Sequence, residues 1–256
     1  MNVFQILSIS QDLAGLTYFL GTLLMAIPVP VYGVKKWGPK LIVDGIYSSI
    51  LVNLYETLIL FVVQLGNYLG INWTYYISWL YQLLTGELQV YTLIRTLYAT
   101  ITSFPYGGIN PIVGPLSLFL SLISGFMSIT GTLIVISQLV YNYVGLILAL
   151  GILMISIPFR IGRSIGGSFI GFSIVFYVGL PLLPSFLSAF NVNVLQSTVG
   201  SADNLTVLAT QVIPAYIEGT VLMPLVYLGI LASLSVGIGS VISGSYSRLP
   251  IPVDFL

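Results

Sequence analysis

Residues 151–184 read GILMISIPFRIGRSIGGSFIGFSIVFYVGLPLLP. Pro158 ends one apolar helix, because proline lacks a backbone N–H and disfavours a helical conformation in the residue before it. Arg160 and Arg163 follow in a short basic turn, and Gly166 stands near the start of a second, glycine-rich apolar helix. Two apolar helices joined by a basic turn predict a membrane hairpin.

The rest of the chain has the same character as this hairpin. Of its 256 residues, 57% are hydrophobic and 5% are charged, whereas a soluble domain uses about a quarter of its residues for charge. Apolar runs of spanning length recur with short polar gaps between them. Because lipid cannot satisfy backbone polar groups and the runs lack the alternation of barrel strands, these segments should be helices.

The sequence therefore predicts an all-α fold: a polytopic transmembrane helical bundle of about seven spans in the cell membrane. One integral membrane domain should cover residues 1–256, because no gap between apolar runs has room for another domain. A hydropathy window of about 20 residues places the spans near 12–31, 42–66, 88–107, 114–136, 142–159, 166–189 and 218–241.

The basic residues suggest an orientation, since Lys and Arg are enriched in cytoplasmic loops. All of them except Arg95 fall on one side of the seven-span arrangement: Lys35, Lys36, Lys40, Arg160, Arg163 and Arg248. The acidic residues Asp12, Glu87 and Asp203 fall on the other side. An N-out, C-in protein follows from this distribution.

Ionisable residues inside predicted spans are costly and need a partner or a function. Glu56 and Arg95 lie near the centres of the second and third spans at matched depth, so they could pair. The pair would be either a structural clasp or part of a polar path. Glu218 opens the last span between Pro214 and Pro224, where it would line a cavity or lie in the interface.

An enzymatic function is improbable on residue content alone. The sequence has no Cys and no His, which removes thiolate nucleophiles, imidazole bases and most transition-metal ligands. Aspartyl proteolysis within a membrane needs two facing aspartates, and Asp44, close to Lys40 at the inner end of its span, is the single candidate. We expect no catalytic residue, no cofactor and no metal site.

The 151–184 hairpin carries a family resemblance. Its pattern consists of Pro158, Phe159, Arg160, Arg163, Gly166, Tyr177 and Pro181. It resembles archaeal membrane proteins related to the TrbL-type channel subunit of type IV secretion systems. Within that group, the chain looks most like the CedA family of the crenarchaeal, conjugation-like DNA-exchange system.

The resemblance implies a membrane subunit of a machine that imports DNA from a partner cell. It also implies a HerA-type ATPase and small pilin-like membrane subunits as partners, besides membrane lipid, in a homo- or hetero-oligomer. Arg160 and Arg163 would then face the ATPase or DNA in transit, although as positive-inside anchors they need no further role.

Two other functions remain open from the residues alone. A small-solute transporter or permease would use Glu56, Arg95 and Glu218 as its polar path. A purely structural membrane partner would need none of them. The zero net charge offers no basic surface for high-affinity binding of nucleic acid.

Overall fold

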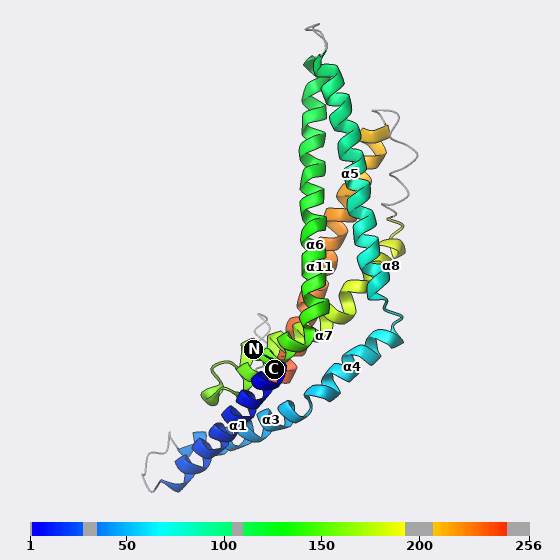
Figure 1. Ribbon diagram of the computed structural model, residues 1–256. Coiled ribbons are helices and arrows are strands. Elements are labelled where there is room, and N and C mark those ends of the chain that lie inside the picture. The colour runs from blue at the N-terminus through cyan, green and yellow to red at the C-terminus, as the bar shows by residue number, and fades with distance from the viewer. Residues whose placement is uncertain (1, 28–34, 104–109, 193–206, 245–256) are drawn as a thin grey trace, which may run out of the picture. The chain divides into compact units, whose positions relative to one another are not determined.

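A computed structural model describes residues 2–27, 35–103, 110–192 and 207–244 of the chain. Every described element is helical, so the predicted all-α class is confirmed (Figure 1). The elements are α1 (Val3–Ala26), α3 (Trp37–Asn53), α4 (Tyr55–Tyr68), α5 (Trp73–Ser103), α6 (Asn110–Ser156), η1 (Pro158–Arg160), α7 (Arg163–Gly179), η2 (Leu180–Leu182), α8 (Leu183–Ala189), η3 (Leu208–Val212), α10 (Ile213–Tyr216), η4 (Ile217–Leu222) and α11 (Met223–Ser243).

The chain divides into two compact units. Unit 1 contains Met1–Gly70, Asn142–Gly179 and Leu231–Leu256, and unit 2 contains Ile71–Tyr141 and Leu180–Ile230. Both α6 and α11 contribute residues to each unit. The single membrane domain expected over residues 1–256 stays a prediction.

Small residues bring the helices of unit 1 into backbone contact. A Cβ atom added at Gly21 of α1 would lie 2.8 Å from the Ile42 nitrogen of α3. One added at Gly45 of α3 would lie 2.8 Å from the Tyr18 nitrogen of α1. Neither position has room for a side chain, and the two contacts fix α1 and α3 as an antiparallel pair.

The glycines that open α7 make the same kind of contact on two sides. A Cβ atom at Gly166 would lie 2.8 Å from the Ile155 nitrogen of α6. Gly167 and Gly171 lie against the α11 backbone at Gly239 and Ser235. Small residues recurring along a membrane helix thus serve packing within this chain.

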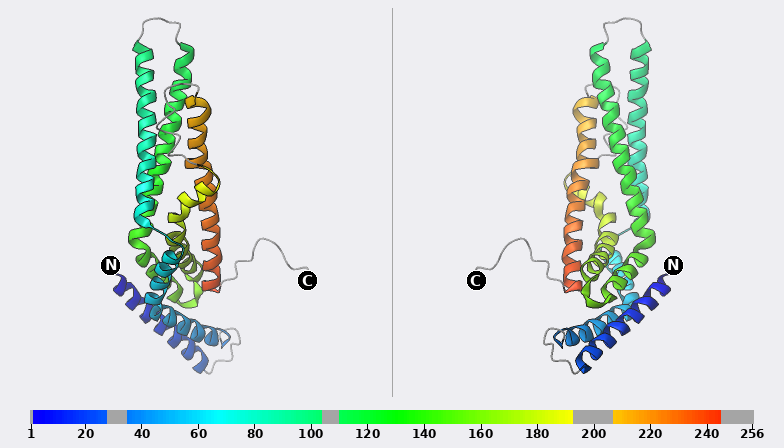
Figure 2. Two further views of the ribbon diagram at one scale, coloured as in Figure 1. Left: turned by 90° about the vertical axis from the view of Figure 1, so that its right-hand side faces the viewer. Right: turned by 90° about the vertical axis from the view of Figure 1, so that its left-hand side faces the viewer.

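Unit 2 contains an antiparallel pair made of α5 and the first part of α6, which lie side by side in both views of Figure 2. Tyr76 and Ser137 share a buried hydrogen bond of 3.1 Å between their hydroxyl groups. The Gln138 amide donates to the Tyr81 hydroxyl at 3.0 Å. We call this pair the α5–α6 hairpin.

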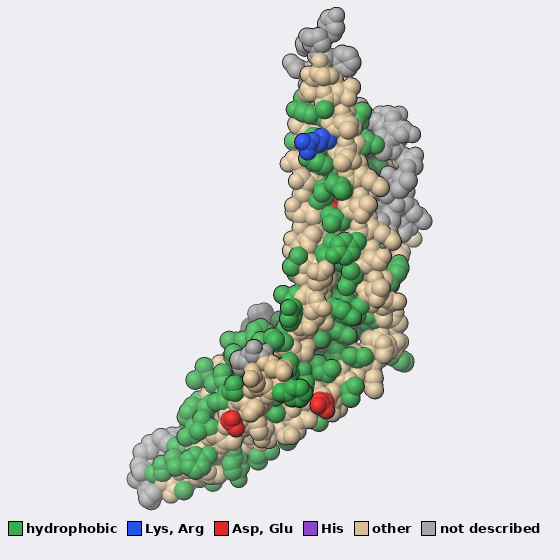
Figure 3. Space-filling model, in the orientation of Figure 1, with side chains coloured by type: hydrophobic (Ala, Val, Ile, Leu, Met, Phe, Trp, Pro, Cys, Tyr) green, Lys and Arg blue, Asp and Glu red, His purple; other side chains and the backbone are tan. Residues whose placement is uncertain are grey.

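The structure does not support a count of about seven spans. Among the described residues, three helical segments are long and apolar enough to cross a membrane: Val113–Ser156, Arg163–Ala189 and Thr210–Ser243. A fourth is obtained if Trp37–Asn53 and Tyr55–Tyr68, which meet at a 56° bend, form one broken span. Figure 3 shows hydrophobic side chains over much of one face, with few charged ones.

The largest correction concerns the fourth and fifth predicted spans, 114–136 and 142–159. The two predicted spans leave residues 137–141 between them as a connection, but α6 runs through these residues without a break. They contain neither glycine nor proline, so nothing in them stops a helix. With 47 residues, α6 is about 70 Å long, about twice the thickness of the hydrocarbon core.

Candidate functional site

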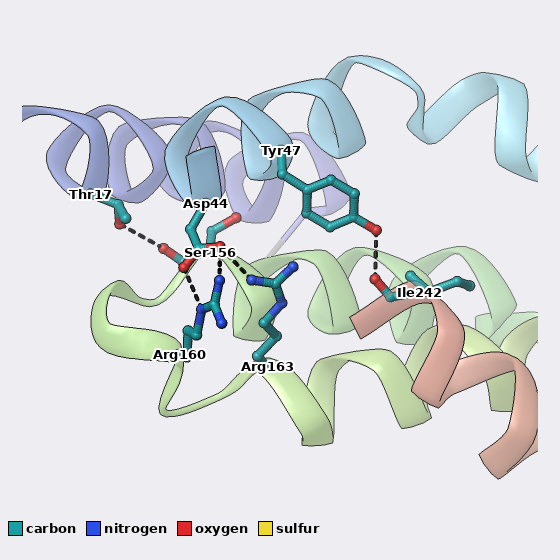
Figure 4. Close-up of polar contacts among 7 residues, drawn as sticks. All are labelled: Thr17, Asp44, Tyr47, Ser156, Arg160, Arg163 and Ile242. Carbon is teal, nitrogen blue, oxygen red and sulfur yellow. Dashed lines mark hydrogen bonds and ion pairs between the residues drawn. The ribbon is translucent and has the colours of Figure 1, made fainter. Parts of the chain in front are cut away.

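An ion-pair cluster joins α3 to the turn between α6 and α7, all within unit 1 (Figure 4). The Asp44 carboxylate accepts hydrogen bonds from Arg160 Nε at 2.6 Å and from Arg160 Nη2 at 2.9 Å. Arg163 Nη1 donates to the same carboxylate. The two-nitrogen contact of Arg160 fixes the geometry, because the guanidinium fork matches a carboxylate.

The backbone of this turn is strained at the residue that pairs with Asp44. Ile157 is extended before Pro158, as expected for a residue preceding proline. Phe159 and Arg160 both have φ of 63°, a left-handed conformation that costs non-glycine residues of order 1 kcal/mol each.

Two further contacts tie α1 and α11 to the same end of unit 1. The Arg163 guanidinium lies 5.3 Å from the ring centre of Tyr47, and the Tyr47 hydroxyl donates to the carbonyl of Ile242 in α11. Thr17 of α1 donates to the Ser156 carbonyl of α6 at 3.3 Å. The cluster is therefore a junction of five helices: α1, α3, α6, α7 and α11.

The junction carries an excess of positive charge, with two arginines on one aspartate. The Asp44 side chain is 10% exposed and that of Arg163 is 15% exposed, whereas the Arg160 side chain is 44% exposed. Lys40 lies one turn before Asp44 on α3, with its ammonium 5.6 Å from the Trp37 ring centre. We call this end of unit 1, defined by Lys35, Lys36, Lys40, Arg160 and Arg163, the basic end.

The basic end suits anions better than metals. The Arg160 side chain is 44% exposed, and a guanidinium binds phosphate and carboxylate groups. No group of three or more acidic side chains that could hold a metal ion exists among the described residues.

The four residues predicted for the cytoplasmic hairpin are brought together by the structure. Pro158, Arg160 and Arg163 form the turn, and Gly166 is the buried glycine that lets α7 approach α6. The sequence reasoning missed their partner Asp44. The sequence places Asp44 and the two arginines at the same end of their predicted spans, and this shared depth could have indicated the pairing.

The three predicted intramembrane polar residues lie in different elements. Glu56 is in the first turn of α4 in unit 1, and Arg95 is in α5 of unit 2. Glu218 is in η4 of unit 2. All three are exposed, and the Glu56–Arg95 pair stays a prediction.

Of the charged residues on which the predicted orientation rests, two lie outside the described residues and one is buried. Arg248 and Asp203 lie outside the described residues. Glu87 is fully buried in unit 2, where it accepts a hydrogen bond from Thr130 of α6 at 2.7 Å. Sequence reasoning placed Glu87 among the outer acids, and nothing in its local pattern indicated burial.

Comparisons with known proteins bear on this arrangement. The chain is 43% identical to "DNA import protein CedA" of Sulfolobus acidocaldarius over 257 residues, which is 99% of each protein. The family described as "DNA import protein CedA1" matches residues 1–68, the segment that holds α1, α3 and α4. No solved structure shows a significant match.

Proposed function

Since the chain belongs to the CedA family of DNA import proteins, we propose that it is a membrane channel or platform subunit of a DNA-import machine. The similarity to a named DNA import protein along 99% of both chains carries this proposal. The machine would be related to type IV secretion and conjugation, and the subunit would act without catalysis.

The partners that we propose are those that the resemblance to this family implies. A separate HerA-type ATPase would supply the energy for transport. Small pilin-like membrane subunits would assemble with it.

We further propose that the basic end faces the cytoplasm. The Asp44–Arg160 ion pair supports a common side for the two basic segments around residues 35–40 and 160–163. Both segments are rich in Lys and Arg, which are retained on the inner side of membranes. Arg160 would then be available to the ATPase or to the phosphates of passing DNA.

We keep the N-out, C-in orientation as a proposal, with a smaller number of crossings. The bent pair Trp37–Tyr68 leaves the basic end, and α6 must return to it, because Arg160 and Arg163 follow α6. If α6 crosses once, α5 does not cross; like α1, it is not among the segments that meet the length and hydropathy test. Five crossings result if α1, which is antiparallel to α3, crosses beside it.

Cysteine labelling tests this topology, since the chain has no native Cys. A Cys at Lys36 should be protected from an impermeant thiol reagent in intact cells. A Cys at Gln89, on the exposed face of α5, should react. Labelling of the Cys at position 36, or no labelling of the Cys at position 89, would contradict this topology.

The partner proposal has its own test. Pull-down of the tagged chain from native membranes should recover an ATPase of the HerA type together with small membrane subunits. Recovery of the chain alone, under conditions that keep other membrane complexes intact, would contradict the proposal.

A further inference from the structure

The α5–α6 hairpin encloses one carboxyl group that no described residue neutralises. Glu87 has a relative exposure of 0%. Its Oε1 accepts the hydrogen bond from the Thr130 hydroxyl, and its Oε2 is buried with no hydrogen-bond partner among the described residues. A buried carboxylate with a single hydrogen bond is costly, whereas a neutral carboxylic acid is not.

The surroundings of Glu87 are apolar. Leu83 and Val90 flank it on the buried face of α5, and both are 2% exposed. Phe126 and Leu133 lie one turn to either side of Thr130 on α6, at 4% exposure each. The carboxyl group is therefore held between two hydrocarbon faces.

No counter-ion reaches Glu87 from the elements packed around it. From residue 110 to residue 156, α6 contains no charged residue at all, and its titratable groups are Tyr141 and Tyr143. On α5 the other charged residue is Arg95, which is exposed two turns away. The ion pairs between described residues all involve Asp44.

The remaining titratable groups near the hairpin do not supply a cation either. On α5 they are Tyr75, Tyr76, Tyr81, Tyr91 and Tyr98. The C-terminal part of unit 2 adds Tyr216, whose ring stacks on Phe126 at 6.3 Å between centres, together with Tyr227 and the exposed Glu218.

We propose that Glu87 is a proton-binding site that closes the α5–α6 hairpin when it is protonated and loosens it when the proton leaves. The ionised carboxylate would need water on Oε2, and water can reach it only if α5 and α6 separate. The hairpin would thereby respond to the pH of the compartment that it faces. This inference does not depend on the proposed DNA import.

The direction of the response follows from linkage. Burial raises the pKa of the Glu87 carboxyl from its ordinary value of 4.5 to about 7, and the hydrogen bond from Thr130 partly opposes that rise. At a pH between 4.5 and about 7, Glu87 is protonated in the closed hairpin and ionised in the open one. The ratio of open to closed hairpin should increase about tenfold per pH unit across this window and then level off.

Thiol labelling of the solubilised full chain can measure this ratio. A Cys at buried Leu83 reacts when the hairpin opens, and a Cys at Leu88, which is 48% exposed, reports the reactivity of a free thiol at the same pH. The rate at position 83 divided by the rate at position 88 should rise with pH and level off near pH 7. In Glu87→Gln, which has no proton to lose, the quotient should not change with pH.

A second variant covers the case in which Glu87→Gln does not fold. Thr130→Val removes the hydrogen bond that lowers the pKa of Glu87, so the levelling-off should move to higher pH. Circular dichroism would confirm that each variant keeps its helices. A quotient that is flat in the Glu87 protein, an equal rise in Glu87→Gln, or an unmoved plateau in Thr130→Val would overturn the proposal.

Discussion

The Asp44 carboxylate of α3 binds two nitrogens of Arg160, at 2.6 and 2.9 Å, across 116 positions of sequence. This contact joins the beginning of the bent pair Trp37–Tyr68 to the turn between α6 and α7. Because Arg163 binds the same carboxylate, one aspartate compensates for two arginines. The basic end of unit 1 therefore depends on Asp44 more than on any one of its cations.

Asp44→Asn should destabilise the chain by about 2 kcal/mol. The value lies below the 3–5 kcal/mol typical of breaking a buried pair, because Arg160 is partly exposed and screened. Unfolding in detergent, followed by loss of helical signal, measures the change. Asp12→Asn, on an exposed acid of α1, is the control and should have little effect. Equal stability of the two variants would contradict the role given to Asp44.

Tyr47→Phe should cost about 1 kcal/mol, since it removes the hydrogen bond to the Ile242 carbonyl but keeps the ring beside Arg163. Its effect should not add fully to that of Asp44→Asn, because both changes loosen the same junction. The double variant, unfolded under the same conditions, decides this. Full additivity would show that Tyr47 and Asp44 act independently.

Gly166→Ala should destabilise by about 1–3 kcal/mol, because the new methyl group would meet the α6 backbone near Ile155. Gly131→Ala is the matched control, since a Cβ atom there has no neighbour within 4 Å. Alanine favours the helix by about 0.5–1 kcal/mol over glycine, so Gly131→Ala should stabilise. Effects of the same sign at both positions would contradict the packing described for α7.

The 151–184 hairpin was predictable because its determinants are local. Pro158 disfavours a helical conformation in the residue before it, and a basic turn between apolar helices is typical of a membrane hairpin. The structure accordingly places Pro158, Arg160 and Arg163 in one turn. Gly167 and Gly171, four residues apart on α7, lie against α11, as small residues at this spacing do between membrane helices.

The continuity of α6 was not predictable from a hydropathy window. Polar residues lower the window average equally in a loop and in the middle of a long helix, so a low average does not by itself mark a loop. Asp44 and Glu87 were misjudged for a related reason. Their partners Arg160 and Thr130 lie 116 and 43 positions away, beyond the reach of local patterns.

DNA transfer between cells tests the central claim most directly. Recipient cells that lack this chain should take up marked DNA from donor cells at a strongly reduced frequency, and the intact chain, expressed in the recipient, should restore it. Solute uptake should be unchanged in the same cells. Undiminished DNA import without the chain, with the membrane otherwise intact, would contradict a role in DNA import.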